Sequence, residues 1–322
     1  MPYVPMASQD GDEKLPEVSS SPLILDVEFT EEEDETLAPP LNAVDEISTA
    51  RARSPMELPG SLPTPPGRAR VVTVTNQKGG VGKTTTVINI GAQLALRGHR
   101  ILVVDSDSQG NCATGLGVDK SRVRTTTRDL ILSPETAVGS RQATAVDNLH
   151  IIVGDRSLVG LEQEMMRQLG RERRMKEALE PLLPHYDIVL IDTPPSLGLV
   201  TINALVASDG ILIPVQTEYF ALEGLALLAG TIREVRSLLH EGLGVDGVLL
   251  TMHSQTLLNQ QVAGELLETF PELLVKPPIR RNIRLAEAPS HGVPIHLHDP
   301  ASAGGKDYQE IATVLERRWG LA

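Results

Sequence analysis

Residues 76–86, NQKGGVGKTTT, bring together the residue types that bind a nucleotide phosphate. Glycines let backbone N–H groups close around phosphate oxygens, and the start of a helix behind them favours an anion. Lys83 is expected to reach the β- and γ-phosphates, and the hydroxyl of Thr84 to bind Mg²⁺. The residues expected to contact the nucleotide here are Gly79, Gly80, Val81, Gly82, Lys83, Thr84 and Thr85.

Residue 78 sets this loop apart from the usual phosphate-binding pattern. The common pattern GxxxxGK[ST] requires glycine at position 77, where the chain has Gln77. The chain instead fits the variant KGGxGK[ST], in which a second lysine, Lys78, precedes Lys83. One lysine is sufficient to hold a phosphate, so Lys78 is either a solvated surface lysine or a contact to a further phosphate.

Three aspartates stand at the end, or just after the end, of apolar runs that are typical of buried strands. Asp105 ends RILVVD, Asp107 follows two residues later on the same face, and Asp192 ends DIVLID. Asp192 is expected to hold Mg²⁺ through a water, and Asp105 and Asp107 to lie near the γ-phosphate. Thr84, Asp105 and Asp192 are the predicted metal site. The alternative role for Asp105 and Asp107 is to cap a helix or a turn.

The elements that position these residues alternate between strand and helix from residue 71 onward. Apolar runs predict six buried strands, at residues 71–75, 100–105, 149–153, 187–192, 210–215 and 247–252. A helix is expected over residues 84–97, ended by Gly98, and residues 157–183 are expected to be mostly helical. The alternation predicts an α/β fold with a mostly parallel, doubly wound sheet, whose ligands bind beyond the carboxyl ends of the strands.

Composition divides the chain near residue 70. Residues 1–70 contain 14 acidic against 5 basic side chains and 11 of the 23 prolines. Such a stretch cannot bury enough apolar surface to offset chain entropy, so we expect a disordered acidic tail over residues 1–70 and a folded domain over residues 71–322. The formal charge of the whole chain is −13, which argues against a globally basic nucleic-acid binder.

The rest of the composition limits the class of protein. Cys112 is the only cysteine, which excludes an intramolecular disulfide and an iron–sulfur cluster held by one chain. No apolar run approaches the roughly 18 residues of a spanning helix, and the N-terminus has no basic region followed by an apolar stretch. We therefore expect a soluble cytoplasmic protein that has no membrane partner.

From residue 71 to the end, the chain resembles the ParA/Soj family of partition ATPases, which carry a deviant Walker A motif in their phosphate loop. Beyond that loop the resemblance rests on DSDSQGNCATGLG, IDTPPSLGLVTINAL, PVQTEYFALEGL and RNIRLAEAPSHGVPI, which begin at residues 105, 191, 214 and 281. It implies ATP hydrolysis with Mg²⁺ by a homodimer that forms with ATP and binds DNA without sequence preference. It also implies a ParB-like partner that stimulates an otherwise slow hydrolysis, and association with the nucleoid.

The resemblance implies roles for individual residues as well. In relatives, the lysine at the position of Lys78 crosses a dimer interface to the partner's ATP. Asp107 would position the attacking water, Asp105 would support the metal region, and Asn282 matches a position that hydrogen-bonds adenine. The expected DNA contacts are the arginines of one basic cluster, of which Arg284 matches a family contact: Arg280, Arg281 and Arg284.

The chain departs from the family pattern at three places. Ser108 replaces a proline in the loop after Asp107, which removes a fixed φ. Arg280 replaces the proline usually found near Asn282, and the loop at residues 253–261 lacks a second DNA-contact arginine. The alternative to a DNA-binding patch is an arginine face that is paired with carboxylates.

Two other functions stay open at this point. A MinD-like membrane ATPase needs a C-terminal amphipathic helix rich in lysine, whereas DYQEIATVLERRWGLA spaces its apolar residues like a core-packed helix. A scaffold that holds ATP without hydrolysing it is the other alternative, because a shifted loop at Ser108 would be costly for catalysis. No motif identifies the cargo as a chromosome, a plasmid or a protein assembly.

Overall fold

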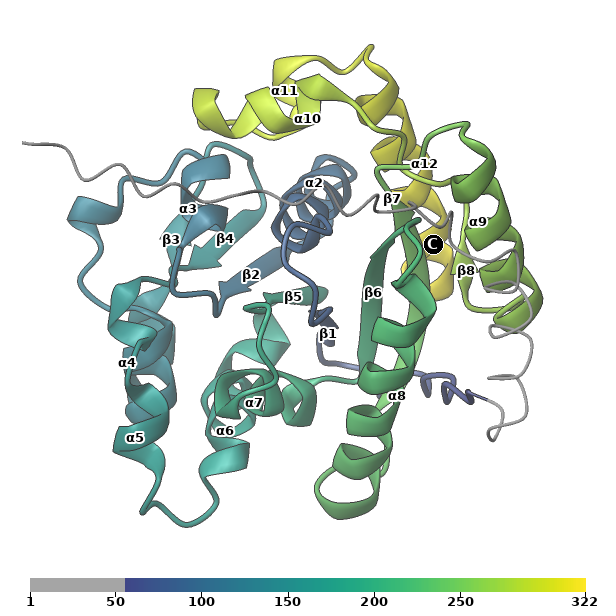
Figure 1. Cartoon of the computed structure of the whole chain (residues 1–322). Helices are drawn as coiled ribbons and strands as arrows, with labels where there is room; N and C mark the ends of the chain where they lie inside the picture. Colours follow the sequence, from purple (N-terminus) through teal and green to yellow (C-terminus); the bar gives the residue numbers. More distant parts are fainter. Residues whose placement is uncertain (1–55) are drawn as a thin grey trace, which may run out of the picture. The chain divides into compact units, whose positions relative to one another are not determined.

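A computed structural model of the chain describes residues 56–322 (Figure 1). Residues 1–55 of the predicted acidic tail therefore lie outside the described residues. Residues 56–69 belong to the same compact unit as the rest of the described chain. Val245 N donates to Pro59 O at 2.7 Å, and Met56 and Leu58 pack against the core. Residues 56–69, which composition assigns to the acidic tail, thus pack on the sheet. A count of charges and prolines does not register the few apolar residues that make these contacts.

A sheet of eight strands forms the centre of the described chain. The strands follow the order β3-β4-β2-β5-β1-β6-β7-β8, and all neighbours are parallel except β3 and β4. Their bounds are Arg70–Val74 (β1), Ile101–Asp105 (β2), Gln142–Ala143 (β3), Leu149–Ile152 (β4), Ile188–Asp192 (β5), Gly210–Gln216 (β6), Gly244–Thr251 (β7) and Leu274–Val275 (β8). The six predicted strands and the predicted fold class are confirmed.

Helices cover both faces of the sheet, as the continuous apolar strands require (Figure 1). Side chains alternate along β1, so Val72 and Val74 pack on one face and Val71 on the other. The first face carries α2 (Lys83–Leu96), α3 (Asn111–Gly115), α11 (Ile295–His298) and α12 (Ala303–Arg318). The second face carries α4 (Thr127–Leu132), α5 (Leu161–Met165), α6 (Arg174–Leu179), α7 (Leu199–Ala207), α8 (Ala221–Leu238) and α9 (Leu257–Thr269).

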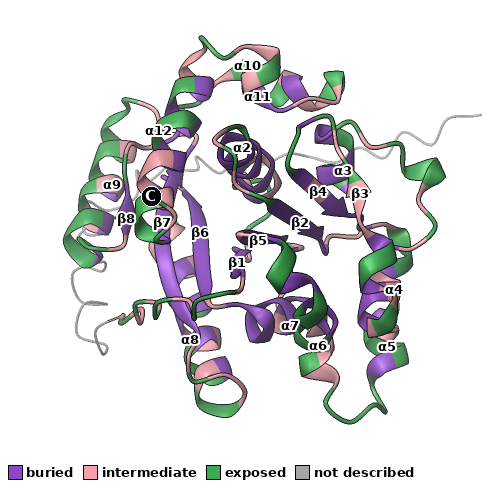
Figure 2. Cartoon of the chain, turned by 180° about the vertical axis from the view of Figure 1, so that it is seen from behind, coloured by how far each residue is buried: buried purple, intermediate pink, exposed green. Residues whose placement is uncertain are grey.

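Figure 2 shows the result of this layering: the strands are buried and the outer sides of the helices are exposed. The core is almost entirely aliphatic, as the low aromatic content predicts. One further short helix, α10, spans Ile283–Glu287. The remaining helical segments are single 3₁₀ stretches: Lys120–Arg122 (η1), Pro134–Ser140 (η2), Arg156–Leu158 (η3), Arg171–Arg173 (η4), Glu180–His185 (η5) and Ala288–His291 (η6).

The expectation of one mostly helical region over residues 157–183 is only partly right. The region is divided into α5, α6 and the short segments η3, η4 and η5. Gly160 and Gly170 have φ values of +93° and +67°, and each stands just before a new helical segment. A left-handed residue interrupts the helical hydrogen-bond pattern, so these glycines break the region into pieces. The two-residue strands β3 and β8 are absent from the prediction because they are too short to show alternation.

The amino ends of the strands are tied together by the buried carboxylate of Asp246 in β7. Arg70 donates to it from Nη2 at 2.6 Å and from Nε at 3.3 Å. Trp319, directly after α12, donates its indole N–H at 2.8 Å, and the Ser61 hydroxyl also donates to Asp246. One carboxylate thus joins the N-terminal segment, two strands and the C-terminal helix, on the edge opposite to the phosphate loop.

Candidate active site

The phosphate loop lies between β1 and α2, at the carboxyl edge of the sheet. Gly80 and Gly82 have φ values of +76° and +89°, and Gly82 directly precedes the first residue of α2. Glycine reaches this left-handed region without steric cost, whereas a side chain would strain the backbone. The predicted order of strand, glycine turn and helix is therefore present in the structure.

Two buried residues that sequence reasoning missed hold the loop in place. Asn76 donates from Nδ2 to Pro214 O at 2.7 Å and accepts from the backbone N–H of Lys78 at 3.0 Å. Thr251, at the end of β7, donates from its hydroxyl to Val81 O at 2.8 Å. The loop is thus fastened to the ends of β6 and β7. In the sequence, these two residues could have been found as the polar residues that stand at the ends of apolar runs.

Lys83 is buried, with 7% of its surface exposed, and it turns back on the loop. Its Nζ donates to Lys78 O at 3.2 Å. Burial lowers the pKa of Lys83, while the carboxylates of Asp192 and Asp107 oppose the shift. The two carboxylates favour the charged form of Lys83, and an ammonium that is partly removed from water interacts strongly with the phosphates of a nucleotide.

Lys78 lies on the outside of the same loop and forms an ion pair with Glu218, which directly precedes Tyr219 and Phe220. The two side chains are 47% and 45% exposed. Tyr219 and Phe220 are 50% and 67% exposed and contact each other edge to face. A lysine, a carboxylate and an exposed aromatic pair therefore form one surface beside the phosphate loop.

Asp105 and Asp192 are neighbours in the register of β2 and β5, and Asp192 is also paired with Val74 of β1. Asp192 is fully buried, and its Oδ2 accepts from the Thr84 hydroxyl at 2.6 Å. Its Oδ1 has no hydrogen-bond partner within the described residues. Asp105 accepts from the backbone N–H groups of Asp107 at 3.1 Å and Cys112 at 3.0 Å.

The electrostatics of this pair follow from its burial. Burial raises the pKa of Asp192 to about 6, partly opposed by hydrogen bonds from Thr84 and Cys112. Burial also raises the pKa of Asp105, and the charge of Asp192 adds to the shift. Two desolvated carboxylates with an unsatisfied oxygen and a threonine hydroxyl fit a divalent cation, which supplies the missing positive charge.

Asp107 begins a tight turn, in which Gly110 N donates to Asp107 O at 3.0 Å. Its Oδ1 accepts from Gln109 N at 3.0 Å, and no described donor reaches its other oxygen. Gly154 packs directly on this turn, because a side chain there would come within 2.6 Å of the carbonyl oxygen of Asp107. The predicted catalytic carboxylate is therefore held on a fixed loop with one oxygen free.

The predicted adenine contact and two of the three predicted DNA contacts have partners within the chain. Asn282 caps α10 by accepting from Arg284 N at 2.8 Å. Arg280 donates to Asp307 through Nε and Nη2, and Arg284 donates to Glu287 at 2.8 Å. These pairs agree with the alternative of a carboxylate-paired arginine face.

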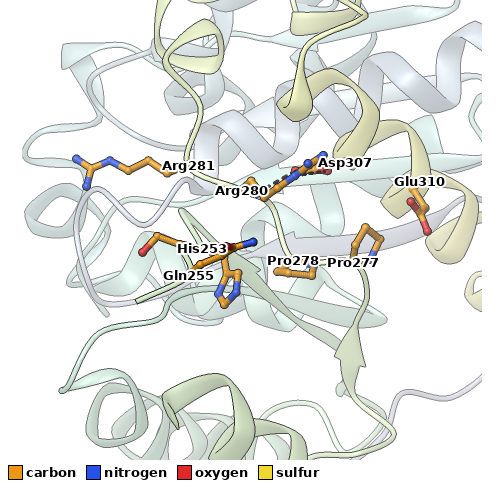
Figure 3. Close-up of a pocket in the computed structure, with 9 residues that line it drawn as sticks. His253, Gln255, Pro277, Pro278, Arg280, Arg281, Asp307 and Glu310 are labelled. Atoms are coloured by element: carbon orange, nitrogen blue, oxygen red, sulfur yellow. Dashed lines mark hydrogen bonds and ion pairs between the residues drawn. The ribbon is translucent and has the colours of Figure 1, made fainter. Parts of the chain in front are cut away.

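Arg281 differs from its neighbours, because no carboxylate pairs with it in the described part of the chain. It lines an open cavity of about 570 Å³ between the end of β7 and α12. Figure 3 shows Arg280 directed to Asp307 while Arg281 extends in the opposite direction. The residues around the cavity are His253, Ser254, Gln255, Pro277, Pro278, Arg280, Arg281, Asp307 and Glu310. Asn282 is not among them.

The C-terminal helix α12 packs against α2 in the core, through Tyr308, Ile311 and Leu315. Among residues 56–322, no helix combines the length and the apolar character that crossing a bilayer requires.

The chain is similar in sequence to known proteins over most of the described residues. A family model described as an AAA domain matches residues 69–245. The sporulation initiation inhibitor protein Soj of Bacillus subtilis is 48% identical over 244 residues, which cover 76% of this chain and 96% of Soj. The chromosome partitioning protein ParA of Caulobacter vibrioides is 43% identical over 252 residues, covering 77% of this chain and 94% of that protein.

Solved structures share the fold. Cobyrinic acid a,c-diamide synthase of Mycobacterium smegmatis, with a bound ATP analogue and magnesium, is 33% identical, with a TM-score of 0.68 over 78% of this chain and 96% of that chain. The Cyanothece McdA(D38A)–ATP complex has a TM-score of 0.70 at 22% identity, over 78% and 96% of the two chains. On the extent of its match to Soj and ParA, the chain belongs to the ParA/Soj family of partition ATPases.

Proposed function

We propose that the protein hydrolyses ATP with Mg²⁺ as a homodimer closed over two nucleotides, and that this dimer binds DNA. The observation that carries the proposal is the set of groups gathered at one sheet edge. Lys83, the Thr84–Asp192 pair and Asp107 lie there together, and Lys78 lies beside them on the surface. The family membership supports the same chemistry, and the related synthase binds an ATP analogue with magnesium.

The loop and Lys83 would hold the phosphates. Backbone N–H groups of residues 79–85 would surround the phosphate oxygens, and Lys83 would exchange its contact with Lys78 O for an anionic oxygen. The Thr84 hydroxyl and the Asp192 carboxylate would hold Mg²⁺, with Asp105 supporting the region. When bound, Mg²⁺ neutralises charge on the β- and γ-phosphates.

Asp107 would orient the attacking water. Its Oδ1 is occupied by Gln109 N, and the free oxygen is available to accept a hydrogen bond from water. The turn up to Gly110 and the close packing of Gly154 hold the carboxylate in one place. Positioning of this kind contributes about 10²–10⁴-fold to the rate of a proton-transfer step, so Asp107→Ala should reduce phosphate release by a factor in that range.

Lys78 would act across the dimer. Two nucleotides that face each other concentrate negative charge, and each added ammonium offsets part of it. Lys78 is exposed, so it can reach a second copy of the chain. It lies beside an aromatic pair, and aromatic residues are enriched at protein interfaces. Its ion pair with Glu218 is exposed, so separating it costs at most about 1 kcal/mol.

Light scattering of the full chain tests this proposal. The Asp107→Ala variant with Mg²⁺-ATP should double its mass relative to the same variant with ADP. Lys78→Ala in that background should stay monomeric, whereas Lys306→Ala, which removes an exposed lysine on α12, should still dimerise. A monomer in Asp107→Ala at saturating Mg²⁺-ATP would refute the dimer. Phosphate release by the unmodified chain, absent in Lys83→Ala, separates hydrolysis from a scaffold that only holds ATP.

DNA binding would rest on Arg281, with Arg280 and Arg284 contributing only after their carboxylate partners are displaced. Binding should then be electrostatic, and each phosphate contact should contribute about −0.9 to the slope of log K against log salt. Arg281→Ala should make that slope less negative by about one for each copy of the site that contacts DNA. An unchanged slope would remove Arg281 from the interface. A ParB-like partner would stimulate hydrolysis, which a phosphate assay with the partner measures.

A membrane role is disfavoured by the packing of α12. An interfacial helix needs its apolar face free, but Ile311 and Leu315 are fully buried against the core. Pelleting of the ATP-bound chain with anionic vesicles would reverse this conclusion.

A further inference from the structure

The only cysteine of the chain lies inside the proposed metal region. Cys112 is in α3, is fully buried, and its Sγ lies 3.3 Å from Asp192 Oδ2. One ligand atom from each of Asp105, Cys112 and Asp192 can be chosen so that all three lie within 4.8 Å of one another. No other group of three such side chains occurs in residues 56–322.

The unpartnered oxygen of Asp192, already noted at the proposed magnesium site, also belongs to this cluster. Asp192 Oδ1 is buried and has no hydrogen-bond partner in the part of the chain described. A buried carboxylate oxygen without a partner is costly, and a bound cation would remove that cost. Two carboxylates meet here, and Lys83 is the cation whose charge acts on Asp192.

Sulfur changes which cation suits the cluster. Mg²⁺ prefers oxygen ligands at near-octahedral geometry, whereas Zn²⁺ and related soft cations accept thiolate together with carboxylate in tetrahedral sites. With Zn–S and Zn–O bonds of about 2.3 and 2.0–2.2 Å, two tetrahedral ligands are about 3.5–3.7 Å apart. The distance of 3.3 Å between Cys112 Sγ and Asp192 Oδ2 is close to that separation.

We propose that Asp105, Cys112 and Asp192 form a binding site for a thiophilic divalent cation of the Zn²⁺ and Cd²⁺ class, and that this cation excludes Mg²⁺ from Asp192. The cation replaces the proton of the Cys112 thiol, which leaves to solvent, and no other covalent bond changes. Asp105 has lone pairs left beyond its two backbone hydrogen bonds. The Thr84 hydroxyl or a water completes four ligands. The first half of the proposal is independent of nucleotide chemistry, and the second half rests on the proposed function.

Cadmium provides a direct test on the full chain without nucleotide. A thiolate bound to Cd²⁺ gives an ultraviolet charge-transfer band, and with one cysteine in the chain any such band reports Cys112. We expect the band to saturate at one Cd²⁺ per chain. Cys112→Ser should abolish it, and Asp192→Asn should weaken Cd²⁺ binding at least tenfold. Asp119→Asn, which removes an exposed carboxylate outside the cluster, should leave it unchanged.

The results separate the two halves of the proposal. No band at saturating Cd²⁺, or the same Cd²⁺ affinity in Asp192→Asn as in the parent, overturns the site. Circular dichroism of each variant establishes that the fold is retained. If Cys112→Ser does not fold, the Cd²⁺ affinity of Asp192→Asn tests the site. Added Mg²⁺-ATP should reduce the band. A band that persists while ATP binds overturns the exclusion of Mg²⁺ alone, and a failure to bind ATP counts against the proposed function while the cadmium site stands.

Discussion

Replacing Asp192 by asparagine should stabilise the nucleotide-free protein while destroying its proposed activity. Asp192 is fully buried, and burial raises its pKa from 3.8 to about 6. A carboxyl group whose pKa is raised in the folded state favours folding when it is protonated. The contribution of Asp192 to stability is therefore fully present below pH 3.8, and it is lost as the pH rises through about 6.

The size of the effect follows from the shift. About two pKa units at 1.36 kcal/mol each give a cost on the order of 3 kcal/mol above pH 6. Asparagine has the same shape without the charge. Its amide oxygen can accept from the Thr84 hydroxyl as Asp192 does at 2.6 Å, and its NH₂ group can donate to a neighbouring carboxylate such as Asp105. At about 2–4 °C per kcal/mol for a chain of this size, the melting temperature should rise by roughly 6–12 °C.

The assay is thermal unfolding of the full chain, followed by circular dichroism near pH 8 and near pH 4. The gain should appear at the higher pH and shrink towards zero at the lower one, where Asp192 itself is protonated. Asp119→Asn is the matched control, because hydrogen bonds from Ser121 lower the pKa of this exposed carboxyl group. A lower melting temperature for Asp192→Asn near pH 8, or an equal gain at both pH values, would refute the reasoning.

Three further changes test other parts of the structure. Ser108→Pro should raise the free energy of unfolding by about 0.4–1 kcal/mol, as measured by urea unfolding. Ser108 is the second residue of the turn in which Gly110 N donates to Asp107 O, and proline is favoured at that position. A loss of stability would mean that the backbone there is incompatible with proline. Asp246→Ala should lower the same free energy by about 3–5 kcal/mol, since Arg70 would be left buried and unpaired; a loss below about 1 kcal/mol on urea unfolding would contradict the importance of this ion pair. Glu218→Gln should raise the affinity of the proposed ATP-dependent dimer by about two- to fivefold, because it frees the Lys78 side chain from an exposed ion pair. Sedimentation at low salt measures this affinity. An unchanged affinity would show that the ion pair does not oppose dimerisation.

The parts of the site that lie within one local run of sequence are predictable. The glycine turn and Lys83 follow from a strand, a loop and a helix that are consecutive in the chain. The proximity of Asp105 and Asp192 also follows, because both residues end parallel strands and such strands end at one edge of the sheet. Local pattern and strand polarity are therefore sufficient for the centre of the site.

Contacts that depend on the order of the strands are not predictable in this way. Asn76 meets Pro214, and Thr251 meets Val81, because β6 and β7 follow β1 in the sheet. The apolar runs alone do not give that order. The partner of Arg280, an aspartate 27 residues later, likewise depends on how α12 packs. Charge counts marked the arginine cluster but could not tell which of its members is already paired.

Both ends of the described chain lie near the carboxylate of Asp246, on the same side of the molecule. Trp319 and Ser61 meet there, on strand ends that face away from the phosphate loop. A fluorophore or a surface tether joined after residue 322 would therefore stand far from the nucleotide and from Lys78. Single-molecule measurements of nucleotide-driven pairing could then use such a label without obstructing the face where two copies are proposed to meet.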